Sequence, residues 1–143
     1  MDLKERVEKS VKLRSEGKNC AQCVFASFSD IYGINEETAL TLTASLGSGI
    51  AGMREACGAV LGISLLAGLD KSGSKPESVK LTKSLAQKYK DIYGSIVCGE
   101  ILGFRPFREE VSEQQRLNCK NNSCTIKIED AAKIYAEYLK AKE

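Results

Sequence analysis

Six cysteines and no histidine define the chemistry open to this chain of 143 residues. In chain order they are Cys20, Cys23, Cys57, Cys98, Cys119 and Cys124. The lack of histidine excludes a Cys-His nucleophilic pair, a Ser-His-Asp triad and a zinc site supported by histidine. Thiol and disulfide exchange, an all-thiolate metal or cluster site, and ordinary buried cysteine remain as interpretations.

The first two cysteines form a CxxC pair, Cys20-Ala21-Gln22-Cys23, at the start of a predicted helix. Asn19 stands three residues before Gln22, which is a variant of the capping box, so this helix is expected to begin at Cys20. Dithiol oxidoreductases use a pair in this position, but a thioredoxin requires a βαβ context that the sequence lacks. The pair therefore fits a redox role, half of a tetrahedral metal site, or two core residues.

The elements that carry the later cysteines also favour thiolate chemistry. Cys98 and Cys124 are expected in or just before the first turns of their helices, and Cys57 about one turn into its own. Unpaired amides and the positive end of the helix dipole lower a cysteine pKa at such positions. Cys57 also fits a purely structural role, because a small apolar thiol suits an apolar helix.

Helical periodicity recurs from end to end, and the chain has only two prolines. We predict one all-α domain over residues 1–143, a bundle of about six helices with a central apolar helix. The predicted helices cover 3–16, 20–32, 36–47, 53–69, 75–93 and 126–142, with a short helical turn at 96–102. The segment 53–69 has no polar face and belongs at the centre, where Gly58, Ala59 and Gly62 would let a neighbouring backbone approach closely.

Charge and hydropathy narrow the class of protein. The net charge of +2 comes from 21 basic and 19 acidic residues, which does not indicate nucleic-acid binding. Residues 38–69 contain only two charges, Arg54 and Glu55, but each uncharged half is shorter than the roughly 20 apolar residues of a membrane span. The charged N-terminus is unlike a signal peptide, so we expect a cytoplasmic protein with reduced cysteines. A second copy could also bury the apolar helix, which leaves a homodimer open.

One stretch has the pattern Cys-Gly-Ala-x-x-Gly: Cys57-Gly58-Ala59-Val60-Leu61-Gly62. It matches fully the motif of the redox-active proteins labelled C_GCAxxG_C_C, and the chain resembles this family over nearly its whole length. The other stretches that carry the resemblance are Asn19-Cys20-Ala21-Gln22, Cys98-Gly99-Glu100-Ile101-Leu102-Gly103, and Cys124 ahead of Glu129-Asp130-Ala131-Ala132. The resemblance implies that Cys20, Cys57, Cys98 and Cys124 are the functional set, and that Cys23 and Cys119 are additions. Members are often encoded near transporter genes, which implies a functional link to transport but brings no substrate.

The leading hypothesis is a cytoplasmic thiol protein that cycles between dithiol and disulfide with an unknown redox partner. Cys20 would attack, Cys57 would resolve the mixed disulfide, and Cys98 and Cys124 would form a second pair or an electron relay. In the alternative hypothesis the same four thiolates hold zinc or an iron–sulfur cluster without turnover. In a third, the cysteines only pack within an interaction module.

Overall fold

The computed structural model describes the backbone of residues 1–102 and 122–143, and the side chains of 1–102 and 124–143. Cys119 lies outside the described residues. The described part is all helical, with no strand, which confirms the predicted fold class. Its elements are α1 (Leu3–Ser15), α2 (Cys20–Ala26), the 3-10 helix η1 (Ser29–Tyr32), α3 (Glu36–Leu42), α4 (Gly58–Asp70), α5 (Lys75–Tyr93), α6 (Cys98–Leu102) and α8 (Asn122–Lys142).

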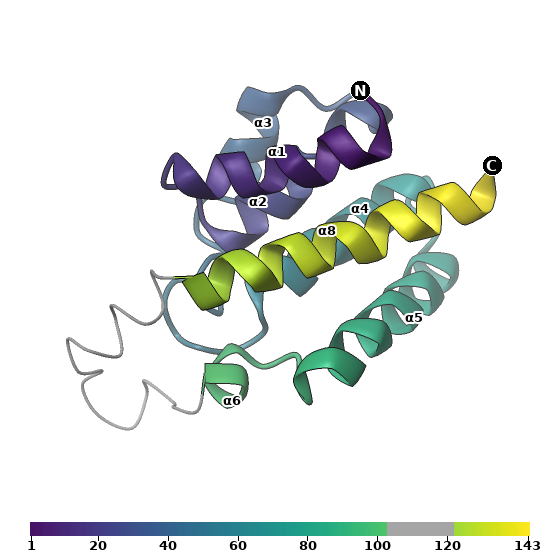
Figure 1. Cartoon of the computed structure of the whole chain (residues 1–143). Coiled ribbons are helices and arrows are strands. Elements are labelled where there is room, and N and C mark those ends of the chain that lie inside the picture. The colour runs from purple at the N-terminus through teal and green to yellow at the C-terminus, as the bar shows by residue number, and fades with distance from the viewer. Residues whose placement is uncertain (103–121) are drawn as a thin grey trace.

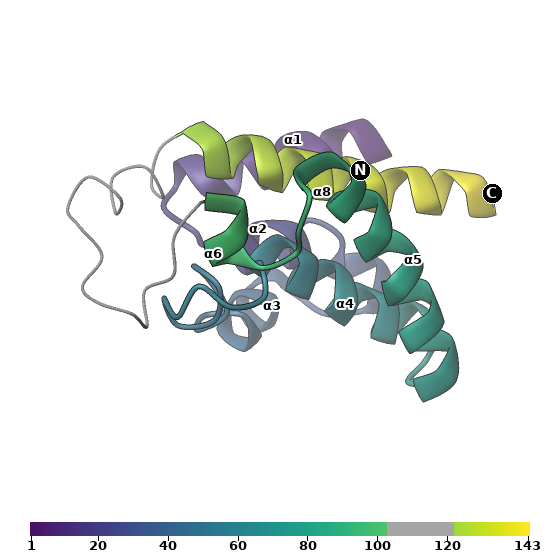
Figure 2. The same ribbon diagram turned by 90° about the horizontal axis from the view of Figure 1, so that it is seen from below.

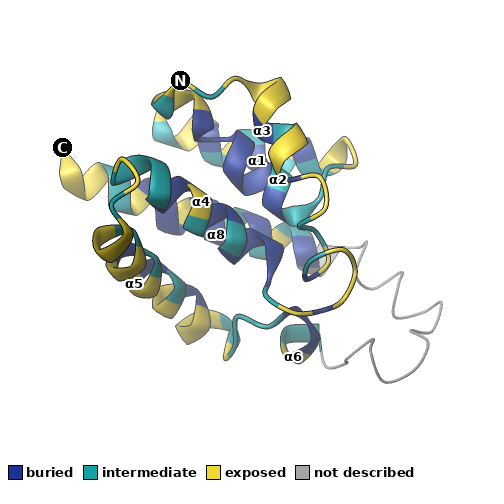
Figure 3. Cartoon of the chain, turned by 180° about the vertical axis from the view of Figure 1, so that it is seen from behind, coloured by how far each residue is buried: buried dark blue, intermediate teal, exposed yellow. Residues whose placement is uncertain are grey.

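The apolar helix α4 lies at the centre of the bundle, as its sequence predicts. It packs mainly against α2 and α5, with α8 also in contact, while α1 and α8 run side by side in opposite directions (Figures 1 and 2). Ala59, Ile63 and Leu66 on α4 are completely buried, whereas the outer face of α5 is exposed (Figure 3). The central helix is thus covered by its own chain, and a homodimer stays a prediction.

Local signals set most helix ends. The side chain of Asp2 accepts a hydrogen bond from the Glu5 amide at the start of α1, and Asn35 caps α3 in the same way. The helix α5 has a proline in its first turn and ends at Gly94, whose φ of 78° suits glycine. No helix within the described ranges is both long enough and apolar enough to cross a membrane.

The segment between α3 and α4 differs from its prediction. The third helix ends at Leu42 and not at Gly47, and the central helix begins at Gly58 and not at 53. Residues 54–57 instead pair with residues 96–99 through an isolated antiparallel bridge between Ala56 and Val97. Backbone at 55–57 that is paired with another segment cannot also be helix, so the placement of Cys57 one turn inside a helix was wrong: it is the N-cap of α4.

Two further boundaries shift by about a turn. The predicted helix 20–32 is α-helical only to Ala26 and then continues as η1 to Gly33, whose φ is 82°. The last helix begins at Asn122 and not at 126, so Cys124 lies in its first turn. The predicted turn at 96–102 begins at Cys98, because the preceding residues are held in the bridge.

Candidate functional site

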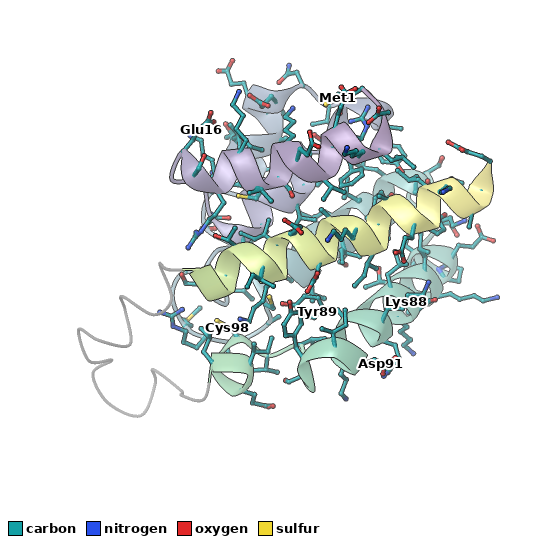
Figure 4. All side chains as sticks on the ribbon, in the orientation of Figure 1. Met1, Glu16, Lys88, Tyr89, Asp91 and Cys98 are labelled. Carbon is teal, nitrogen blue, oxygen red and sulfur yellow. The ribbon has the colours of Figure 1, made fainter. Side chains whose placement is uncertain are left out.

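The four cysteines of the predicted set line one small cavity, which we call the cysteine cavity. Its volume is about 30 Å³. Its walls are formed by Arg14, Asn19, Cys20, Ser48, Gly49, Arg54, Cys57, Gly58, Cys98, Ile101, Leu102, Cys124 and Lys127. Figure 4 shows Cys98 at the start of α6, at the end of the bundle where α8 begins. Cysteines from four separate helix starts therefore line one cavity.

Asn19 fixes the position of Cys20. Its side chain accepts a hydrogen bond from the Gln22 amide, and the Gln22 side chain accepts one from the Asn19 amide, which completes the predicted capping box. The Asn19 side-chain nitrogen also donates to the carbonyl oxygens of Thr43 and Ala44, at 3.2 and 3.0 Å. One residue thus caps α2 and ties its start to the loop that follows α3.

That loop carries unusual backbone geometry beside the cavity. Ser48, Ile50, Ala51 and Arg54 all have positive φ, which is uncommon for residues other than glycine and strained for the β-branched Ile50. A Cβ at Gly49 would lie 2.5 Å from the Arg54 Cα, so only glycine lets the loop fold back on itself here. The fold directs the buried Arg54 guanidinium to the Cys98 sulfur, with Nη1 to Sγ at 3.7 Å.

The bridge between residues 54–57 and 96–99 brings Cys57 and Cys98 to the same wall. The Cys57 amide donates to the Ile96 carbonyl at 2.7 Å, and the Cys98 amide donates to the Glu55 carbonyl at 2.6 Å. Each cysteine is thereby held by its backbone as well as by the start of a helix.

The glycines of the Cys-Gly-Ala-x-x-Gly motif allow α2 and α4 to cross closely. A Cβ at Gly58 would lie 3.1 Å from the Cys20 Cβ and 3.0 Å from the Leu46 carbonyl oxygen. A Cβ at Gly62, one turn later, would lie 3.0 Å from the Val24 Cβ. The expected close approach at these small residues is confirmed, and it is what brings Cys20 beside Cys57.

Cys20 and Cys124 line the same cavity, and each shifts the pKa of the other. Hydrogen bonding with Cys20 is the largest cause of the lowered Cys124 pKa, and together with the positive charges of Arg14, Lys127 and Arg54 it brings that pKa to about 6. The same bond, followed by burial, raises the pKa of Cys20 well above its ordinary value. The pair therefore favours one shared proton, with Cys20 as the thiol and Cys124 as the thiolate.

Cys57 has its own partner, the buried hydroxyl of Tyr89, which lies 3.3 Å from the sulfur. Burial raises the Cys57 pKa, while the Tyr89 hydroxyl and the amides of Ala59 and Val60 act in the opposite direction. Figure 4 shows Tyr89 reaching from α5 into the interior beneath α8. Cys57 is thus a thiol at neutral pH, in a site that accommodates its thiolate if a proton is removed.

The second cysteine of the CxxC pair lies away from the cavity. Cys23 is completely buried, its sulfur donates to the Lys18 carbonyl at 3.6 Å, and burial raises its pKa to about 12. None of the five described cysteines is in a disulfide. The CxxC spacing therefore does not bring two sulfurs into the cavity.

Sequence reasoning did not single out the residues that support the sulfurs. Arg14 and Lys127 lie on α1 and α8, and no local pattern marks them. Arg54 did carry a signal, because it is one of two charges in the otherwise uncharged stretch 38–69. Helical spacing within 75–93 indicates only that Tyr89 belongs to the core. It is completely buried, but its hydroxyl also contacts Cys57.

A metal ion would require several ligand side chains to converge on one point. Within the described residues, no three cysteine, aspartate or glutamate side chains converge as a group that could hold a metal ion. Structural zinc requires four ligands at about 2.3 Å for sulfur. We derive no step through a metal, and the metal hypothesis stays a prediction.

Comparison with known proteins gives one result. The family model described as "Putative redox-active protein (C_GCAxxG_C_C)" matches residues 18–138, which includes all four cysteines of the cavity. The chain matches no curated protein and no solved structure.

Proposed function

The chain belongs to the C_GCAxxG_C_C family of redox-active proteins, and on that basis we propose that it is a two-electron thiol redox protein whose reactive pair is Cys20 and Cys124. The observation that carries this proposal is that Cys20 and Cys124 line one cavity and shift each other's pKa in opposite directions. A thiolate beside a thiol is the state from which a disulfide forms, and the nearby positive charges favour that state without a histidine.

The proposed cycle is balanced within the pair. In the reduced state Cys124 is a thiolate and Cys20 a thiol. Formation of the bond between their sulfurs releases two electrons to an acceptor and the single proton of Cys20. An external dithiol returns two electrons and restores the starting state. Cys124 is the attacking sulfur in this scheme and Cys20 the resolving one, which differs from the roles that the sequence alone favoured.

Cys57 and Cys98 have a supporting role in the proposal. They line the same cavity, flank the same backbone bridge and are held by Tyr89 and Arg54 respectively. We propose that they form a second dithiol that passes the two electrons of the external dithiol on to the Cys20–Cys124 disulfide and is itself reduced again by that external dithiol. This differs from the pairing of Cys98 with Cys124 that the sequence suggested.

The test is a redox titration read by peptide mass spectrometry. Trypsin cleavage after lysine and arginine places Cys124 alone in residues 121–127 and Cys20 with Cys23 in residues 19–54. Equilibration between about −300 and −150 mV is expected to convert these peptides into one cross-linked species. A chain that never forms this cross-link at any potential in that range would refute the proposal.

Matched variants locate the bond. Cys124→Ser and Cys20→Ser should each abolish the cross-linked species, whereas Cys23→Ser should keep it, because Cys23 lies outside the cavity. Circular dichroism of each variant reports whether the helices are retained. Loss of the cross-link in Cys23→Ser, with the fold intact, would show that Cys124 bonds to Cys23 and not to Cys20.

Metal analysis of the same protein preparation distinguishes the metal hypothesis from the dithiol cycle. Anaerobic purification followed by metal and labile-sulfide analysis is expected to give less than one equivalent of either per chain. Stoichiometric zinc or iron bound through the four cysteines would replace the redox cycle with the alternative function.

We further propose a cytoplasmic location, because a reducing compartment regenerates the dithiol.

A further inference from the structure

The cysteine cavity is very small for a site of thiol exchange. Its volume is about 30 Å³. Three of the four cysteines around it are buried, with Cys57, Cys98 and Cys124 6, 8 and 7% exposed, while Cys20 is partly exposed. The space beside Cys124 therefore accepts a molecule of only a few non-hydrogen atoms.

This size limits the electron acceptor. A protein disulfide or glutathione disulfide brings a bulky group on each sulfur, and attack requires the reacting sulfurs to approach closely. Neither fits in the cavity as it stands, so either reacts only when the cavity opens, as during long equilibration in a redox buffer, and more slowly than a small oxidant. Hydrogen peroxide has two oxygen atoms and no substituent.

We propose that the oxidant of the Cys20–Cys124 pair is hydrogen peroxide, admitted by the size of the cysteine cavity and reduced there to water. The proposal rests on the proposed dithiol cycle and names its electron acceptor.

The steps balance with the groups present. The Cys124 thiolate attacks one peroxide oxygen, the O–O bond breaks, and Cys124 sulfenic acid and hydroxide result. The hydroxide takes the proton of Cys20 and becomes water. The Cys20 thiolate then attacks the Cys124 sulfur, the S–O bond breaks, and a second hydroxide leaves as the disulfide forms.

The surrounding charges suit this reaction. Arg14, Arg54 and Lys127 line the cavity, and no carboxylate does so among the described residues. Negative charge moves from sulfur to the departing oxygen during the attack, so fixed positive charges beside both atoms stabilise the transition state. Cys20 already contacts Cys124, so the second step needs no large movement.

The test compares oxidants by size. The protein and free cysteine are exposed at pH 7 to hydrogen peroxide, tert-butyl hydroperoxide or oxidised dithiothreitol, quenched with an alkylating agent, and followed through the 121–127 peptide. Ionisation gives Cys124 an advantage of at most about 30-fold over free cysteine at this pH, from pKa values of about 6 and about 8.5, because a thiolate of lower pKa is also less nucleophilic. We expect hydrogen peroxide to exceed that advantage, and tert-butyl hydroperoxide to show at least a tenfold smaller advantage.

Variants identify the intermediate. Cys20→Ser should stop at Cys124 sulfenic acid, which dimedone traps, whereas Cys23→Ser should proceed to the disulfide at the wild-type rate. If Cys20→Ser does not fold, dimedone added to the wild-type protein at early times provides the same measurement.

The failures of the two proposals are distinguishable. If hydrogen peroxide shows no advantage beyond about 30-fold, or tert-butyl hydroperoxide reacts equally well, while redox buffer still forms the Cys20–Cys124 bond, the peroxide proposal falls and the dithiol cycle stands. If no oxidant and no redox buffer forms the bond, both fall.

Discussion

Removal of the Cys20 sulfur should raise the pKa of Cys124. In the folded protein that pKa is about 6, against about 8.5 for a free cysteine. The difference of about 2.5 units corresponds to roughly 3 kcal/mol, and hydrogen bonding with Cys20 is its largest source. A hydrogen bond to a charged group contributes about 1.5–3 kcal/mol, which is roughly 1–2 pKa units. The variant Cys20→Ala should therefore titrate at Cys124 between about 7 and 8.

The assay follows alkylation of the 121–127 peptide by iodoacetamide from about pH 5 to pH 10. The midpoint of the pH–rate profile gives the pKa. The rate at a single pH does not, because a thiolate of higher pKa is intrinsically more nucleophilic and offsets its smaller population. Arg14, Arg54 and Lys127 remain in the variant, so the midpoint should stay below that of free cysteine.

The matched control is Cys23→Ala, which removes a buried sulfur of the same helix outside the cavity and should leave the midpoint unchanged. A midpoint in Cys20→Ala within about 0.3 units of the wild type, in a protein with intact helices, would refute the paired arrangement.

Three further predictions concern other parts of the molecule. Gly58→Ala should lower the free energy of unfolding by about 1–3 kcal/mol in urea titrations, because its Cβ would crowd Cys20. In the control Gly68→Ala, nothing lies within 4 Å of the added Cβ, so the higher helix propensity of alanine should raise the free energy of unfolding by up to about 1 kcal/mol. Equal effects of Gly58→Ala and Gly68→Ala would contradict the close crossing of α2 and α4. Tyr89→Phe should raise the Cys57 pKa, measured by alkylation of the peptide containing residues 55–71, and an unchanged midpoint would show that the hydroxyl does not support the thiolate. Stability should be greatest near pH 8. Above about pH 8.5 the thiols of Cys20, Cys23 and Cys57, whose pKa values are raised, ionise only in the unfolded chain, and each lowers the free energy of unfolding by about 1.4 kcal/mol per pH unit. As the pH falls from about 8.5 to 6, the stabilisation from the Cys124 thiolate is lost. A free energy of unfolding that rises above pH 9 in urea titrations would contradict this reasoning.

Much of the secondary structure could be predicted because its causes are local. The helix 75–93 has its proline, its apolar spacing and its terminal glycine within its own sequence, and the structure reproduces both ends. The start of α2 at Cys20 follows from Asn19 and Gln22. The segment 53–57 was wrong because an apolar run is compatible with helix or extended chain, and pairing with the distant residues 96–99 decided between them.

The residues of the cysteine motifs also divide into what local sequence predicts and what only packing decides. The sequence indicated small residues at Gly58 and Gly62 and a close neighbour, but not that α2 would be that neighbour. The CxxC spacing drew attention to Cys23, yet in the structure Cys23 faces the Lys18 carbonyl and not the other sulfurs. Spacing along a helix says which residues share a face, while the packing of that face says what they meet.

By itself, then, the sequence determined an all-helical chain without histidine and four cysteines at or near helix starts. It also determined that any activated thiol must draw its acidity from helix ends, from Lys or Arg, or from a metal. Only the tertiary structure decided that Cys20 meets Cys124, that Tyr89 meets Cys57, and that Arg54 meets Cys98. The physical reason is that helix formation depends on hydrogen bonds and side chains a few residues apart, whereas these contacts join helices that are distant in sequence and depend on how their apolar faces pack.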